Sequence, residues 1–62
     1  MEVESLRIRR QSIEKYIMDG IVNLKRYRFN VSKDEIITDN EIDYKKAELI
    51  FIKKYNDYKK SI

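Results

Sequence analysis

The chain of 62 residues has no proline and a single glycine, so it offers few of the residues that usually make a polypeptide turn sharply. A β-sheet protein of this length needs several tight turns, and such turns favour Gly, Asn-Gly or Pro. The scarcity of these residues therefore predicts an all-α fold. At this length we expect one small helical domain covering residues 1–62.

Residues 38–62 predict a long helix. Thr38 and Glu41 have the spacing of a capping box, in which each side chain bonds the backbone N–H of the other residue. Apolar and aromatic residues then follow at helical spacing along one stripe. The members of this stripe are Tyr44, Ala47, Phe51, Tyr55, Tyr58 and Ile62. The unbroken apolar run of residues 49–52 adds a second apolar side, which indicates a helix that lies between neighbours.

Residues 12–27 predict another long helix, because apolar residues recur there at helical spacing. The stripe consists of Ile13, Ile17, Ile21, Leu24 and Tyr27. Gly20 lies on its edge, where it either allows another backbone to approach or is simply tolerated. We begin this helix at about Ser5. The competing interpretation is a short strand, since apolar residues and arginines alternate at residues 6–9.

A short connector is predicted at residues 29–37. Asn30 suits a helix C-cap, and Ser32 and Glu35 repeat the capping-box spacing, which can start a single helical turn. The alternative is a short strand at residues 28–31, where polar and apolar residues alternate. With the connector, the two long helices make a helical hairpin.

Self-association is predicted because each long helix has more than one apolar side. A chain of this size buries only about 60% of the surface that its unfolded form exposes, so a lone hairpin leaves apolar surface uncovered. We therefore predict a homodimer in a four-helix arrangement. The residues expected in the core or the dimer interface are Ile17, Gly20, Val22, Leu24, Leu49, Phe51, Ile52 and Tyr55.

The sequence contains no combination of residues that predicts catalysis. Cys and His are both absent, which removes disulfides, Cys/His metal sites and the usual nucleophile and base pairs. Asp39, Glu41 and Asp43 cluster at the start of the predicted last helix, where the helix dipole favours negative charge without any catalytic role. We predict no enzyme activity, no cofactor and no metal.

Positive charge is concentrated in the first half of the chain. All five arginines lie in residues 1–31, and this half holds the whole net charge of +3 because acids and bases balance in residues 32–62. Arginine and tyrosine dominate binding hot spots, and guanidinium groups suit phosphates. The predicted partner-binding residues are Arg7, Arg9, Arg10, Arg26, Tyr27 and Arg28.

These features favour a small, non-enzymatic binding protein that occupies the surface of another protein. The composition, with many residues encoded by AT-rich codons, also fits a phage-encoded inhibitor of a host enzyme or defence system. The alternative is a DNA-binding regulator of the ribbon-helix-helix type, in which an N-terminal strand places Arg7 and Arg9 in the major groove. We find no membrane-spanning stretch and no signal peptide, and expect a cytoplasmic protein.

Residues 36–50 resemble part of the short C-terminal domain (SHOCT) family. In that family a short helix is followed by Gly-Ile-Ile-Thr, two or three acids, an aromatic residue and Lys-Lys-Ala-x-Leu-Leu. This chain has Ile36-Ile37-Thr38 and Lys45-Lys46-Ala47-Glu48-Leu49-Ile50, with Glu35 in place of the family's glycine. The resemblance implies a helical hairpin that mediates oligomerisation, and it brings no catalytic residue.

Overall fold

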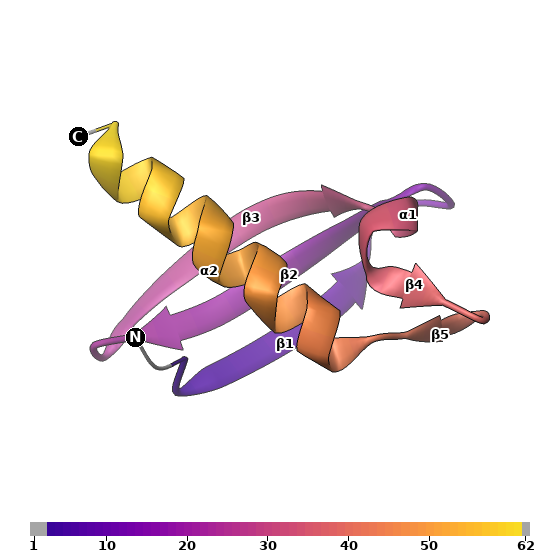
Figure 1. Cartoon of the computed structure of the whole chain (residues 1–62), viewed down its shortest axis with the longest axis horizontal. Coiled ribbons are helices and arrows are strands. Elements are labelled where there is room, and N and C mark those ends of the chain that lie inside the picture. The colour runs from indigo at the N-terminus through magenta and orange to yellow at the C-terminus, as the bar shows by residue number, and fades with distance from the viewer. Residues whose placement is uncertain (1–2, 62) are drawn as a thin grey trace.

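A computed structural model describes residues 3–61 and shows a mixed fold, in which three antiparallel strands pack against one long helix (Figure 1). The sheet has the order β1-β2-β3 and is followed by a short helix, a two-stranded hairpin and the long helix. The elements are β1 (Ser5–Arg10), β2 (Lys15–Val22), β3 (Lys25–Ser32), α1 (Lys33–Ile36), β4 (Ile37–Thr38), β5 (Glu41–Ile42) and α2 (Tyr44–Lys60).

The predicted all-α fold is therefore wrong, and so are the helical hairpin and its four-helix arrangement. Residues 12–27, predicted to be helical, form β2, its flanking turns and the start of β3. The error arises because Ile13, Ile17 and Ile21 are four residues apart, and this spacing satisfies both a helical stripe and the two-residue period of a strand. Self-association by another route stays a prediction.

The two-residue period is visible in the burial of β2. Met18, Gly20 and Val22 are buried against α2, whereas the alternate residues point to the other side of the sheet and stay more accessible. In β1, the strand that was the competing interpretation, Leu6 and Ile8 are half-buried on the α2 side. The sheet thus has one apolar face, and α2 covers it (Figure 1).

Two hairpin turns form without glycine, which explains why the scarcity of glycine misled the prediction of fold class. Asn23 and Leu24 join β2 to β3 with φ values of 52° and 65°, and Asp39 and Asn40 join β4 to β5 with 54° and 66°. Asn and Asp tolerate this left-handed region better than most residues. Leucine does not, and Leu24 is held there with its N–H donating to Glu4 Oε1 at 3.1 Å.

The helix α2 begins later than predicted. Asp43 is its N-cap and accepts a hydrogen bond from the Lys46 backbone N–H at 3.1 Å, whereas Thr38 lies in β4. The other predicted capping box is present at α1, where the Glu35 carboxylate accepts from the Ser32 backbone N–H at 2.9 Å. Asn30, predicted to be a C-cap, lies within β3.

The core lies between the covered face of the sheet and α2. Its buried residues are Met18, Val22, Val31, Ile36, Ala47, Phe51 and Tyr55. Phe51 lies directly over Gly20, so that a Cβ at residue 20 would overlap the Phe51 ring. The single glycine is therefore needed for the close approach of an aromatic ring, and not of a second helix backbone.

The residues predicted for the core or dimer interface are divided by the structure. Gly20, Val22, Phe51 and Tyr55 are buried between the sheet and α2. Ile17 and Ile52 are half-buried, Ile17 on the opposite face of the sheet. The other two are solvent-exposed, Leu24 by 89% at a hairpin turn and Leu49 by 68% on α2.

Candidate functional site

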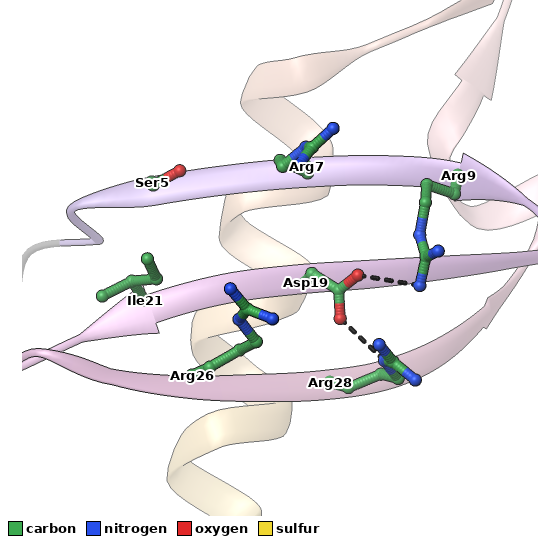
Figure 2. Close-up of a pocket in the computed structure, with 7 residues that line it drawn as sticks. All are labelled: Ser5, Arg7, Arg9, Asp19, Ile21, Arg26 and Arg28. Carbon is green, nitrogen blue, oxygen red and sulfur yellow. Dashed lines mark hydrogen bonds and ion pairs between the residues drawn. The ribbon is translucent and has the colours of Figure 1, made fainter.

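The sheet has one face that no other element in residues 3–61 covers, and we call it the open face. Figure 2 shows it toward the viewer, with α2 behind the sheet. It consists of the residues that alternate with the core-facing ones, because successive side chains of a strand point to opposite sides. These residues are Ser5, Arg7 and Arg9 of β1, Lys15, Ile17, Asp19 and Ile21 of β2, and Arg26, Arg28, Asn30 and Ser32 of β3.

A shallow hollow of about 180 Å³ lies in the middle of the open face. Its lining residues are Ser5, Arg7, Arg9, Asp19, Ile21, Arg26 and Arg28 (Figure 2). Pockets for small molecules usually measure about 300–1,000 Å³ and are mostly apolar. This hollow is smaller and strongly charged, so the open face suits a large, negatively charged partner better than an enclosed small molecule.

Asp19 joins the three strands through two arginines. Its Oδ2 lies 3.1 Å from Arg9 Nη2, and its Oδ1 accepts from Arg28 Nε at 2.8 Å (Figure 2). The hydrogen bond from Arg28 and the positive charges of both arginines lower the pKa of Asp19 below its ordinary value. Asp19 is therefore ionised at neutral pH and neutralises part of the charge of the open face.

Arg7 and Arg26 differ from Arg9 and Arg28 because they form no ion pair with an acid among residues 3–61. Both are exposed and line the hollow from opposite sides of β2, Arg7 facing Asp19 and Arg26 facing Ile21 in the strand register. Their guanidinium groups keep donors available to a ligand. A guanidinium group presents five N–H donors and remains charged at any physiological pH.

The structure brings four of the six predicted partner-binding residues onto the open face: Arg7, Arg9, Arg26 and Arg28. Arg10 ends β1, where its Nε donates to the Ser12 carbonyl oxygen at 3.3 Å. Tyr27 lies on the covered face, where its ring packs edge-on against Tyr55 with centroids 4.9 Å apart. The alternation of arginine and tyrosine in residues 25–28 therefore places the two residue types on opposite sides of β3.

Sequence reasoning missed Asp19 and Ile21 as members of this surface. Residues 15, 17, 19 and 21 alternate with Tyr16, Met18, Gly20 and Val22, and this two-residue period was the available signal. The four-residue spacing of the isoleucines in the same segment also fits a helix, and it conceals this period. Among residues 3–61 no group of three or more acids is placed to hold a metal ion, and no helix is long and apolar enough to cross a membrane.

Comparisons with known proteins add no relative. No protein-family model matches the chain, and neither the curated proteins nor the solved structures give a match. The segment that resembles the SHOCT family, residues 36–50, forms the last residue of α1, then β4, β5, the start of α2 and the residues between them. The functional argument therefore depends on the open face itself.

Proposed function

We propose that this protein binds nucleic acid and that the open face contacts the phosphate backbone. The observation that carries the proposal is the set of four arginines on one uncovered face, opposed there by the single carboxylate of Asp19. Guanidinium groups form paired, charge-assisted hydrogen bonds with phosphate oxygens. Neutralising several phosphates at once releases counterions and supplies most of the free energy of non-specific binding. We place this nucleic-acid-binding protein in the cytoplasm, the compartment expected from the sequence.

The architecture differs from the ribbon-helix-helix alternative. In that class a single strand is followed by two helices, whereas β1 is followed by β2 and β3 in the same sheet. The arginine-bearing strand of that alternative is present as β1, and Arg7 and Arg9 project from the same side of it. The proposed surface is therefore a three-stranded face rather than a two-stranded ribbon.

Arg7 and Arg26 are the best residues for a test. Replacing Arg9 or Arg28 would leave Asp19 without one of its partners, which changes the sheet as well as the charge. Arg7 and Arg26 have no such partner in the described chain, so their removal changes the surface with little effect on folding.

The test measures the mobility shift of a random-sequence DNA duplex at low and moderate salt. We expect retardation that weakens as salt rises. In an Arg7→Ala/Arg26→Ala variant, affinity should fall about tenfold or more, and the slope of log K against log salt should fall by about 2. A Lys45→Ala/Lys53→Ala variant removes the same charge from exposed positions of α2 and should change affinity less than about twofold. Equal losses in both variants would contradict the proposal.

The second candidate is the predicted binder of another protein's surface, including a phage-encoded inhibitor. Exposed apolar side chains at two turns favour it, since Leu24 is 89% and Ile13 67% exposed. Such residues anchor protein interfaces when they enter a partner's pocket. If this candidate is correct, a host protein that binds the wild-type chain should no longer bind the Leu24→Ser variant and should still bind the Arg7→Ala/Arg26→Ala variant.

A further inference from the structure

Charge is distributed unevenly over the three strands of the open face. All four arginines belong to the outer strands, Arg7 and Arg9 to β1 and Arg26 and Arg28 to β3. At the centre of the face, β2 contributes two half-buried isoleucines and the acid Asp19, and its one cation on this face, Lys15, lies at the end of the strand. A carboxylate and apolar side chains do not bind phosphates, so the middle of the face requires a different contact from its two sides.

Duplex DNA offers this arrangement in its major groove, where base edges lie between two phosphate backbones. The groove is about 12 Å wide and admits an α-helix or a two-stranded β-ribbon. Neighbouring strands are about 4.8 Å apart, so β1 and β3 lie about 10 Å apart on either side of β2. With β2 over the base edges, Arg7 of β1 and Arg26 of β3, which no acid of residues 3–61 pairs, lie on the two sides of the groove. Arg9 and Arg28 are instead held at its centre by Asp19.

The side chains of the central region match chemical groups that the major groove displays. Apolar side chains contact the methyl group of thymine, which points into this groove only, and carboxylates accept from the amino group of cytosine. Ile17 and Ile21 supply the first kind of contact and Asp19 the second. Asn30 lies beside Ile17 in the register, and asparagine pairs with adenine through two hydrogen bonds.

The open face lacks the features expected of a single-strand or RNA binder. None of the residues that form it is aromatic, whereas proteins that bind single strands stack bases on aromatic rings. The described tyrosines of the sheet, Tyr16 and Tyr27, pack on the covered side. In duplex RNA the major groove is too deep and narrow for side chains to read.

We propose that the open face binds duplex DNA in its major groove, with β2 over the base edges and with Arg7 of β1 and Arg26 of β3 on the two flanking backbones. This inference rests on the proposed function and specifies the substrate class. It assigns recognition of sequence to Ile17, Asp19, Ile21 and Asn30. Affinity is assigned to the arginines.

The first experiment compares the whole chain with a short DNA duplex, one of its single strands and the RNA duplex of the same sequence, by fluorescence anisotropy at one salt concentration. We expect the DNA duplex to bind at least about tenfold more tightly than either alternative. Methyl green, which occupies the major groove, should displace the protein, and netropsin, which occupies the minor groove, should not. If the single strand or the RNA duplex binds as tightly as the DNA duplex or more tightly, or if netropsin displaces the protein, the inference is overturned and the proposed function stands. Failure to bind any of the three nucleic acids overturns both.

The second experiment selects preferred sequences from a pool of random duplexes. Ile17→Ser should change the preferred bases and leave the salt dependence as it is, whereas Arg7→Ala should keep the preference and lower the salt slope by about 1. Circular dichroism confirms that each variant is folded. An Ile17→Ser variant that is folded and selects the same sequences as the wild type would also overturn the inference.

Discussion

The two faces of the three-stranded sheet have opposite chemistry although they share every strand. The covered face presents Met18, Gly20 and Val22 to α2, and these residues are buried. The open face presents arginines around Asp19, and they remain accessible. Neighbouring residues in a strand point to opposite sides of the sheet. Within each strand, the residues that stabilise the fold therefore alternate with the residues of the proposed binding surface. A substitution should therefore affect one property and spare the other, according to its position in the alternation.

The largest effect is expected at Gly20 on the covered face. In Gly20→Ala the added methyl group would overlap the Phe51 ring, which is fully buried and must move. Overpacking of this kind costs about 1–3 kcal/mol and sometimes more. We expect a loss at the upper end of this range, measured as the free energy of unfolding in urea. Gly20→Ala/Phe51→Leu should recover part of it. An unchanged free energy of unfolding in Gly20→Ala would show that the ring is not confined as described.

A smaller effect of opposite sign is expected at Leu24, which belongs to neither face. Its left-handed conformation costs a non-glycine residue about 1–2 kcal/mol, and its exposed side chain loses no packing on removal. Leu24→Gly should therefore raise the melting temperature by about 3–6 °C, because part of the gain is offset by the entropy of glycine in the unfolded chain. Asn23→Gly is the matched control and should give no gain, since asparagine already tolerates this conformation. Equal gains in the two variants would contradict this explanation.

On the open face, Asp19→Asn should strengthen binding to a DNA duplex of random sequence. The substitution removes a negative charge from the centre of the proposed interface and releases Arg9 and Arg28 to the ligand. A unit charge about 6 Å from a phosphate in water contributes about 0.7 kcal/mol, which corresponds to about a threefold gain in affinity. Anisotropy titration at constant salt measures it. Weaker binding to the random-sequence duplex would contradict this prediction. The contact assigned to Asp19 with cytosine predicts in addition that the sequence preference of the variant changes.

The smallest effect is the dependence of stability on acid pH. Asp19 and Glu35 both have a lowered pKa, Asp19 chiefly through its hydrogen bond from Arg28 and Glu35 chiefly through the backbone N–H of Ser32. A carboxyl group whose pKa is lower in the folded chain stabilises it above the pKa of the unfolded chain, about 4. That contribution is lost as pH falls through the folded value. Stability should fall below about pH 4, and it should fall less in an Asp19→Asn/Glu35→Gln variant.

The last helix, α2, and the short helix α1 could be predicted from sequence because their signals lie in neighbouring residues. Ala47, Phe51 and Tyr55 were expected on one stripe, and α2 buries all three. The capping box of Ser32 and Glu35 lies within four residues and was identified correctly. Patterns of this kind depend on neighbouring residues alone, so one sequence is sufficient to interpret them.

The sheet could not be predicted in the same way, because its strands are defined by partners distant in the sequence. Four-residue spacing in residues 13–21 fits a helix as well as a strand, and only pairing with β1 and β3 decides between them. The turn that allows β2 to pair with β3 contains Leu24, and leucine is not among the residues that favour turns. Four arginines of the candidate site were nevertheless among the predicted partner-binding residues, since guanidinium groups suit phosphates, and their binding role stays a prediction. Their common face became clear only from the strand register.

The clamp of Asp19 between Arg9 and Arg28 means that the open face carries its own counter-anion. At Arg9 and Arg28, a lone phosphate ion or mononucleotide would have to compete with a carboxylate that is covalently tethered and always present at the same place. A polymer engages Arg7 and Arg26 at the same time and does not depend on displacing it. We therefore expect the tethered carboxylate to weaken the binding of small anions at Arg9 and Arg28 more than the binding of extended ones.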